Sequence, residues 1–182
     1  MRYVVTGGSG FIGSHLVKKL QSLDAEVIII DRITNHKSLL KLDYAKKTKH
    51  YFADISDPEL TLKIIQEDDI VFHLAAQSHV DVSFNSPLET TKANVLGTHS
   101  ILNACLENKS RKLIVMSTDE VYGSVSEISD HNLLDPTNPY SASKAAADMI
   151  VNSYKHMYKD MSIITLRSNN IIGPGQFIRN II

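Results

Sequence analysis

The sequence has few of the residues that mark secreted, membrane-spanning or metal-binding proteins. Among its 182 residues there is one cysteine, which excludes an internal disulfide and suits the reducing cytosol. That residue, Cys105, lies in an apolar stretch with helical spacing, which favours a buried structural thiol over a nucleophile. No apolar run approaches the length of a membrane span, and no signal peptide precedes the strand-like residues after Met1. We therefore expect a soluble, cytoplasmic protein without a membrane partner.

The chain also lacks a large excess of charge of either sign. Its net charge is −1 with histidine neutral, so the overall charge gives no indication of binding to nucleic acid or to an anionic membrane. The eight histidines show no spacing typical of metal ligands, and we expect no metal site. The length suffices for one domain with a sizeable core.

What the sequence does contain is a regular alternation of apolar, strand-like runs with helical patterns. Such alternation is typical of a parallel sheet with helices on both faces, and it predicts a Rossmann-like, doubly wound α/β fold. The third run is short and flanked by lysines, as expected for an edge strand. A long helix is predicted from about Pro139 to Tyr158, and its inner side is expected to hold Ala142, Ala145, Ala146, Met149 and Ile150. The predicted strands cover residues 3–6, 27–30, 50–52, 70–74, 113–117 and 162–166.

The first strand leads into a glycine-rich turn and the start of a helix. Gly7 permits a tight turn, Gly10 lets the backbone approach a pyrophosphate, and Gly13 lets the helix pack close to the strand. Asp31 closes the second apolar run at the spacing of a carboxylate that binds the adenosine ribose, and such a carboxylate favours NAD. The cation of Arg32 keeps NADP open as an alternative, because it can accept a 2′-phosphate. Glycines at these positions can also be needed for packing alone.

Polar or small residues follow the predicted strands. In an open α/β sheet, ligands bind beyond the carboxyl ends of the strands, so these residues are expected to share one rim. Helix capping explains single polar residues at such ends better than it explains all of them together. The residues concerned are Asp31-Arg32, Asp54-Ile55, Ala75-Ala76, Thr118–Glu120 and Asn169-Asn170.

Tyr140 and Lys144 lie four residues apart at the start of the predicted long helix, and therefore on the same side of it. An ammonium group beside a phenol lowers the pKa of the phenol from about 10 toward neutrality. The phenolate is then a base that removes the proton of a sugar hydroxyl while NAD takes a hydride from the same carbon. The same spacing also occurs by chance on exposed helices. The catalytic interpretation is favoured here because the pair follows a dinucleotide-binding glycine motif in the same chain.

Several of these segments together point to one family. The chain resembles the extended short-chain dehydrogenases/reductases, in the branch that modifies nucleotide sugars. Within that branch, the segment with the adjacent acids Asp119 and Glu120 resembles the signature of dTDP-glucose 4,6-dehydratases. The segments that carry the resemblance are Thr6–Gly13, His73–Val80, Asn94–Thr98, Ser117–Gly123, Tyr140 with Lys144, and Arg167–Pro174.

The resemblance implies dehydration of a nucleoside-diphosphate-glucose, with dTDP-glucose as the expected substrate, to the 4-keto-6-deoxy sugar. Oxidation at C4 acidifies the C5 hydrogen, water then leaves from C5 and C6, and hydride returns to C6. By resemblance, Tyr140 with Lys144 serves the oxidation step, Thr118 hydrogen-bonds the C4 oxygen, Glu120 is the base and Asp119 the acid. One carboxyl must be ionised and its neighbour protonated, a difference that environment can impose. The alternative is that both acids are solvated loop charges.

The resemblance also implies ligand contacts and a partner. Contacts to the nucleotide sugar are implied for Ser78, Thr118 and Asn169. A homodimer is implied through the helix after Asn94 and the helix that carries Tyr140. The implied NAD-contacting residues are Gly7, Gly10, Phe11, Ile12, Gly13, Asp31, Arg32, Asp54, Ile55, Leu74, Ala75, Ala76, Tyr140, Lys144 and Asn170.

Members of this family have a C-terminal domain that holds the nucleotide, and this chain ends at Ile182, where that domain would begin. We expect an NAD-binding domain with the catalytic residues over 1–168 and the start of a largely lacking substrate-binding region over 169–182. Such a chain is either an inactive fragment or a short natural form. Two other functions stay open: a nucleotide-sugar 4-epimerase or decarboxylase, which usually lacks the acid pair, and a non-catalytic NAD-binding module.

Overall fold

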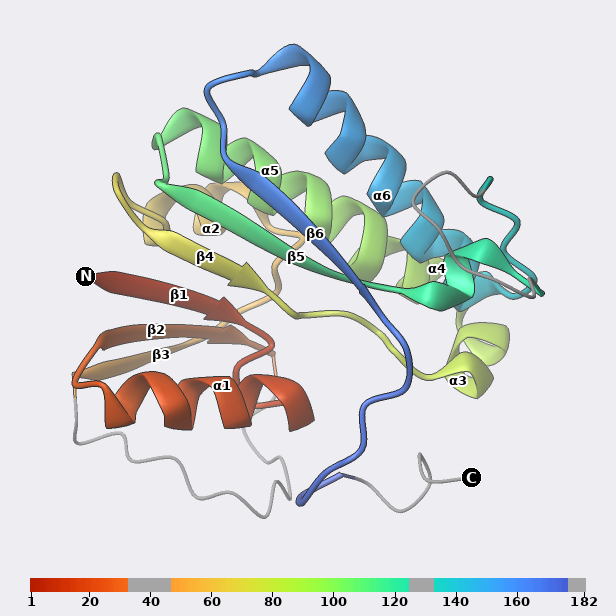
Figure 1. Ribbon diagram of the computed structural model, residues 1–182, viewed down its shortest axis with the longest axis horizontal. Coiled ribbons are helices and arrows are strands. Elements are labelled where there is room, and N and C mark those ends of the chain that lie inside the picture. The colour runs from red at the N-terminus through yellow and green to blue at the C-terminus, as the bar shows by residue number, and fades with distance from the viewer. Residues whose placement is uncertain (33–46, 125–132, 177–182) are drawn as a thin grey trace.

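Six parallel strands form a single sheet in the order β3-β2-β1-β4-β5-β6 (Figure 1). The computed structural model describes residues 1–32, 47–124 and 133–176. This strand order is that of the doubly wound dinucleotide-binding fold, so the prediction of a Rossmann-like parallel sheet is confirmed. Strand β3 lies at one edge, as predicted. The strands are β1 Arg2–Thr6, β2 Glu26–Asp31, β3 Thr48–Phe52, β4 Ile70–His73, β5 Lys112–Thr118 and β6 Ile163–Ser168.

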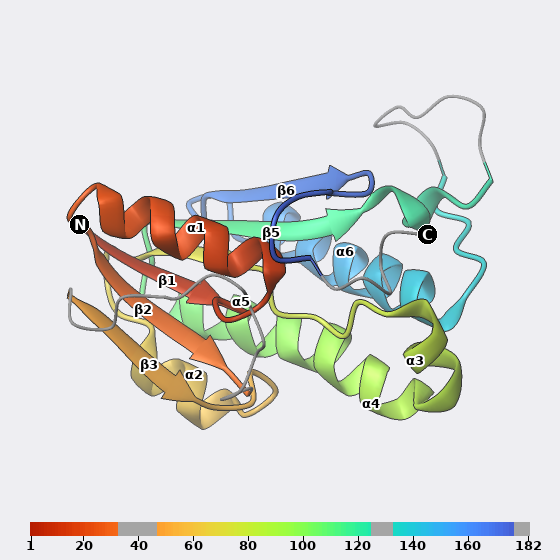
Figure 2. The same ribbon diagram turned by 90° about the horizontal axis from the view of Figure 1, so that it is seen from below.

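The helices cover the sheet from both sides (Figures 1 and 2). On one side lies α1, and on the other lie α2, α5 and α6. Two short helices and a π-helical turn lead into α5, and a 3₁₀ turn follows β5. The bounds are α1 Phe11–Ser22, α2 Pro58–Ile64, α3 Val80–Asn85, α4 Pro87–Thr91, π-helical turn η1 Lys92–Leu96, α5 Gly97–Glu107, 3₁₀ turn η2 Asp119–Tyr122 and α6 Pro139–Met157.

The core consists of two apolar layers separated by the sheet. Because successive side chains of a strand point to opposite faces, Val5 packs with Val17 of α1. Its neighbour Val4 belongs to the other layer, which includes Ile101 of α5 and Val151 of α6. Strands buried on both faces need apolar residues at nearly every position, which is why these runs are continuous in the sequence.

Helix α6 begins and ends close to the predicted bounds, but the predicted inner side is wrong at three of its five positions. Ala142, Ala146 and Met149 face outward, and Met149 is 61% exposed. Ala145 is buried and Ile150 is partly buried. The buried side of the helix carries several polar side chains instead of an apolar stripe, because these side chains find partners on β5, β6 and η1. The buried polar residues of α6 are Ser141, Ser143, Lys144 and Asp148.

After β6, the chain returns across the carboxyl ends of the strands. His15 of α1 is hydrogen-bonded through Nε2 to the Pro174 carbonyl oxygen at 2.8 Å, which ties this return to the opposite side of the sheet. The predicted second region, 169–182, is described only as far as residue 176, and its division from the first stays a prediction. None of the helices within the three described ranges is long and apolar enough to cross a membrane.

Replacement of Gly13 tests the close packing of α1 on the glycine turn. A Cβ atom at this position would lie 2.1 Å from the Gly7 carbonyl oxygen. Inside a helix, alanine is usually more stabilising than glycine by about 1 kcal/mol. The clash with the Gly7 carbonyl oxygen is therefore what makes Gly13→Ala destabilising. We expect Gly13→Ala to lower the midpoint of thermal unfolding, whereas Lys18→Ala, at an exposed position of the same helix, leaves it nearly unchanged. A Gly13→Ala protein as stable as the wild type would contradict this packing.

Candidate active site

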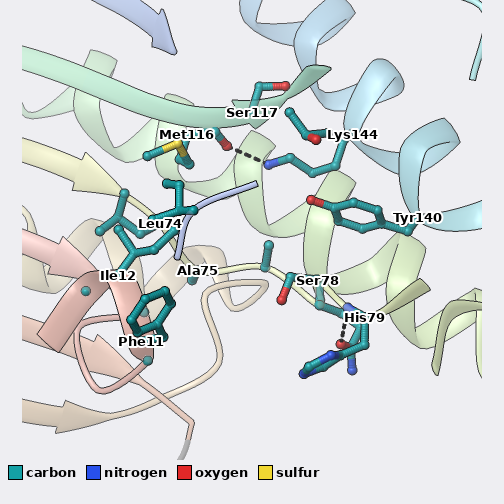
Figure 3. A pocket seen from close by; sticks show the side chains of 18 of the residues that line it. Phe11, Ile12, Leu74, Ala75, Ser78, His79, Met116, Ser117, Tyr140 and Lys144 are labelled. Atoms are coloured by element: carbon teal, nitrogen blue, oxygen red, sulfur yellow. Dashed lines mark hydrogen bonds between the residues drawn. The ribbon is translucent and has the colours of Figure 1, made fainter. Parts of the chain in front are cut away.

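A cavity of about 630 Å³ lies beyond the carboxyl ends of the strands, where the sequence predicted a shared rim. Phe11 and Ile12 reach it from one side, and Tyr140 and Lys144 from the other (Figure 3). Its volume is in the range of small-molecule and cofactor sites. The predicted site residues that line it are Gly7, Gly10, Phe11, Ile12, Gly13, Asp31, Arg32, Asp54, Ile55, Leu74, Ala75, Ala76, Ser78, Thr118, Glu120, Tyr140, Lys144, Asn169 and Asn170.

The glycine turn has the shape of a phosphate-binding site. Gly7 has a positive φ of 69°, and a Cβ there would lie 2.8 Å from the backbone of Ala75 at the end of β4. Gly10 is the N-cap of α1 and provides no side-chain hydrogen bond to the first turn. The N–H groups of that turn have no partners within the helix, and together with the helix dipole they suit a pyrophosphate.

Asp31 is fixed at the end of β2, beside the glycine turn. Its Oδ2 accepts a hydrogen bond from the Ser9 backbone N–H at 3.0 Å, and the residue is buried. The neighbouring Arg32 is exposed, and its Nη1 lies 3.4 Å from Asp54 Oδ2. Burial alone would raise the pKa of Asp54, but hydrogen bonds from Ser56 and the charge of Arg32 lower it below its usual value. The carboxylate of Asp31 and the ion pair next to it fit the adenosine end of NAD.

Lys144 and Tyr140 lie on the buried side of α6 and reach the opposite end of the cavity. The Lys144 ammonium group donates a hydrogen bond to the Met116 carbonyl oxygen of β5 at 2.7 Å (Figure 3). Burial lowers the pKa of Lys144 to about 8, although the Asp148 carboxylate opposes this shift. The Tyr140 backbone N–H donates to Ser83 Oγ at 3.1 Å, which attaches the start of α6 to α3.

The predicted acids lie on η2, directly after β5. Thr118 is the N-cap of this turn: its Oγ1 accepts the Glu120 N–H at 3.3 Å and donates to Asp119 Oδ1 at 3.3 Å. Glu120 Oε2 accepts a hydrogen bond from Asn138 Nδ2 at 3.1 Å. Thr118 and Glu120 line the cavity with Tyr140, whereas Asp119 does not. The structure therefore brings together four of the five predicted catalytic residues and leaves Asp119 beside them.

Residues 4–182 match the family model described as GDP-mannose 4,6 dehydratase. The chain belongs to this family. A dTDP-D-glucose 4,6-dehydratase of Dictyostelium discoideum is 40% identical to it over 203 residues, which cover the whole chain and 46% of that protein. The resemblance to nucleotide-sugar dehydratases among the extended short-chain dehydrogenases/reductases is confirmed. The chain spans about half the length of the curated relatives it matches.

Solved structures of dehydratases and epimerases share the fold of this family member. The DesIV double mutant, a dTDP-glucose 4,6-dehydratase from Streptomyces venezuelae solved with NAD bound, has a TM-score of 0.91 at 34% identity, covering 100% of this chain and 60% of that one. A UDP-glucose 4-epimerase from Thermotoga maritima has a TM-score of 0.87 at 30% identity, with coverage of 97% and 58%. Likeness of fold alone therefore does not choose between the two reactions.

One electrostatic prediction about this dehydratase-family chain is wrong. The sequence predicted that Lys144 lowers the pKa of Tyr140 toward neutrality. Instead, burial and the charge of Glu120 raise the pKa of Tyr140 to about 12, although a hydrogen bond with Thr118 opposes them. The main reason is burial of the phenol, and the charges that act on it beside burial are the carboxylates of Glu120 and Asp119, whereas the Lys144 ammonium group is hydrogen-bonded to the Met116 carbonyl oxygen.

The sequence interpretation missed a set of buried, hydrogen-bonded residues that support the residues lining the cavity. His73 at the end of β4 is fully buried between Thr6 Oγ1, 2.8 Å from Nδ1, and Thr98 Oγ1, 3.0 Å from Nε2. Thr98 donates its own proton to the Asn94 carbonyl oxygen and must accept from His73, so the ring is neutral with its proton on Nε2. Burial, assisted by the charge of Lys144, lowers the pKa of His73 to about 3.

Asn94 connects this support to the loop after β4 and to helix α6. It lies in η1, where the helix is locally wound as a π-turn. Its Oδ1 accepts the Gln77 N–H at 2.7 Å, and its Nδ2 donates to the Gln77 carbonyl oxygen at 3.0 Å and to Ser143 Oγ at 2.8 Å. The Asn94–Thr98 segment was used only for the family resemblance. The Met116 carbonyl could not be found from sequence, since any residue type offers one.

The lowered pKa of Lys144 predicts a pH dependence of stability. Between pH values of about 8 and 10.5 the folded protein has lost this proton and the unfolded chain still holds it, so stability rises with pH in that window. We expect the free energy of unfolding of the wild type, relative to Lys144→Met, to increase by about 3 kcal/mol across the window. Chemical denaturation at a series of pH values measures this. Lys18→Met, at an exposed position, should show no such trend, and a flat difference for Lys144→Met would contradict the shift.

Proposed function

We propose that this chain is the NAD-binding, catalytic part of a nucleoside-diphosphate-glucose 4,6-dehydratase, with dTDP-glucose as the expected substrate. The observation that carries the proposal is one cavity that combines the glycine turn with Thr118, Glu120, Tyr140 and Lys144. A binding module needs the glycine turn but neither the acid nor the buried ammonium group. The names of the relatives support the same reaction class.

The cavity is suited to NAD rather than to NADP. The first turn of α1 would hold the pyrophosphate, and Asp31 would hold the ribose diol and repel a 2′-phosphate. Arg32 has a carboxylate partner in Asp54, which leaves it less suited to a phosphate. When bound, NAD supplies a hydride acceptor at C4 of the sugar and a hydride donor to C6.

In the oxidation step, Tyr140 removes the proton of the C4 hydroxyl and Thr118 donates a hydrogen bond to the C4 oxygen. A phenol with a pKa near 12 is protonated at neutral pH, so this step requires stabilisation of the phenolate in the complex. Lys144 is the cation available on the same helix face. With a pKa of about 8, it is mostly charged at neutral pH.

In the elimination step, Glu120 removes the C5 proton and Asp119 gives a proton to the departing C6 hydroxyl. Glu120 lines the cavity and is oriented by Asn138, which supports its assignment as the base. The assignment of Asp119 rests on the family resemblance, and it requires the side chain to turn from Thr118 toward the cavity. A 4-epimerase is the second candidate, since solved 4-epimerases share the fold, and the product distinguishes the two.

The full-length protein supplied with dTDP-glucose or UDP-glucose is expected to form the 4-keto-6-deoxy sugar, seen by mass spectrometry as the loss of one water. We expect Glu120→Gln to slow product formation by roughly 10²–10⁴-fold. Oxidation should continue in that variant, so that the absorbance of reduced nicotinamide accumulates. Tyr140→Phe should lose both product and absorbance. Glu107→Gln, an exposed position at the end of α5, is the matched control. A sugar with inverted C4 and no loss of water would favour the epimerase.

We also propose a homodimer through η1, α5 and α6. Leu96 of η1 is 54% exposed and Met149 of α6 is 61% exposed, and these two elements pack against each other. Ala142 and Ala146 continue the outward-facing apolar side of α6. Apolar residues on adjacent helices suit a self-complementary contact.

The dimer is tested by charge introduced at its centre. We expect Leu96→Glu and Met149→Glu to convert the full-length protein from a dimer to a monomer in analytical ultracentrifugation, because each would bury an unpaired carboxylate. Leu133→Glu changes an 88% exposed leucine outside these helices and serves as the control. A wild type that sediments as a monomer would refute the proposed dimer.

A further inference from the structure

A buried polar cluster between α6 and strands β5 and β6 has no part in the reaction as derived so far. Arg167 Nε donates to Asp148 Oδ2 at 2.8 Å, and its Nη1 donates to the Tyr122 hydroxyl at 2.6 Å. The guanidinium carbon also lies 5.1 Å from the centroid of the Tyr122 ring. Asp148 and Tyr122 are almost fully buried. The three side chains form what we call the Arg167 cluster.

Two members of the Arg167 cluster belong to elements that carry the proposed chemistry, and the third, Arg167, lies on the strand next to β5. Tyr122 ends η2, the turn that presents Glu120 to the cavity. Asp148 follows Lys144 by one helical turn, and both lie on the buried side of α6. Arg167 is on β6, where it is the register partner of Ser117 on β5. One side chain therefore connects the acid-bearing turn to the helix that holds Tyr140 and Lys144.

The cost of this arrangement indicates more than a structural role. A buried ion pair usually stabilises a fold no better than well-packed apolar side chains of similar size. Asp148 Oδ1 is buried and has no hydrogen-bond partner within the described residues, so Arg167 alone does not satisfy the carboxylate. Lys144 is a buried cation one helical turn before Asp148 on the same side of α6, and opposite charges interact more strongly where water is excluded than in bulk water.

We propose that Arg167 and Asp148 are positioning residues of the active site. Arg167 holds the acid-bearing turn η2 against α6, and Asp148 supplies a buried negative charge one helical turn from Lys144. This inference rests on the proposed dehydration for its kinetic consequences, but not for the charge of Lys144. Loss of Asp148 then affects the oxidation step through Lys144, whereas loss of the bond between Arg167 and Tyr122 affects the elimination step through Glu120.

The other charged groups around Lys144 leave Asp148 as the anion that acts on it. His73 of β4 is neutral, and Tyr140 is protonated at neutral pH. The carboxylates of η2 act on Tyr140, and the charge of Asp148 is what raises the pKa of Lys144 against the effect of burial. The titratable and charged groups that face this region are Tyr140, Asp148 and Lys155 on α6, His73 on β4, Arg167 on β6, and Asp119, Glu120 and Tyr122 on η2.

The first experiment measures the titration of Lys144 in the full-length protein by NMR of its side-chain nitrogen, without substrate. We expect Asp148→Asn, which keeps the shape and an acceptor for Arg167, to lower the midpoint by about one pH unit or more. The alkaline limb of kcat should move to lower pH by the same amount. Asp24→Asn, which removes an exposed carboxylate 2.7 Å from Lys47, is the matched control and should move neither. An unchanged midpoint in Asp148→Asn overturns the role of Asp148.

If Asp148→Asn fails to fold, a double variant that removes both charges of the ion pair provides the same test. Asp148→Asn combined with Arg167→Gln removes both members of the ion pair, so that neither is left without the other, and we expect this variant to fold and to show a lowered midpoint of Lys144. A midpoint equal to that of the wild type in this double variant also overturns the role of Asp148. Both measurements keep their meaning if the protein proves not to be a dehydratase.

The second experiment tests Arg167 through Tyr122→Phe, which removes one hydroxyl and keeps the ring. We expect amide hydrogen exchange of residues 120–123 to become roughly 10-fold faster, measured without substrate. The elimination step should slow by about 10-fold with the oxidation step unchanged, so that reduced nicotinamide accumulates during turnover. Tyr158→Phe, at an exposed tyrosine just after α6, is the control. Unchanged exchange in Tyr122→Phe overturns the role of Arg167, whatever the reaction of the protein.

Discussion

The ammonium group of Lys144, buried against the carbonyl oxygen of Met116, is the interaction on which the rest of the candidate site depends. It attaches α6 to β5 beside the cavity that both residues line. A cation in this position costs free energy, as its lowered pKa indicates, and the surrounding groups reduce that cost. They comprise a strand carbonyl and a carboxylate one helical turn away.

The same site contains a phenol and an ammonium group whose pKa values are shifted in opposite directions by burial. Tyr140 is harder to ionise and Lys144 is easier to neutralise than in water. Both shifts favour the uncharged forms, because burial penalises the phenolate and the ammonium ion alike, and the carboxylates of η2 add to the effect on Tyr140 alone. The folded protein alone therefore does not provide an ionised Tyr140 as a proton acceptor, and its ionisation depends on interactions that a bound ligand adds. Active sites with buried ionisable groups of this kind lower the stability of the fold, and this cost accompanies their reactivity.

The topology explains why residues distant in the sequence meet. All strands are parallel, so every carboxyl end opens on the same side, and the strand order reverses beside β1. Asp31, Ala75, Thr118 and Asn169 each follow a different strand and nevertheless line one cavity. The buried chain from Thr6 through His73 and Thr98 to Asn94 fixes the two halves of that cavity relative to one another.

The sequence by itself determined the sheet, the glycine turn and the start of α6, and nearly all of the site residues predicted from it line the cavity. These depend on local patterns: continuous apolar runs, glycines where a Cβ does not fit, and a cap at Asn138 followed by Pro139. Only the tertiary structure decided which side of α6 is buried, where Asp119 points and how Tyr140 ionises. Each of these depends on partners from other elements. Lys144 and Asp148 are buried where Met116 and Arg167 provide their partners, and Tyr140 stays neutral because it is buried and Glu120 adds negative charge near it. Periodicity describes a helix in isolation, and electrostatics depends on distances that only the fold creates.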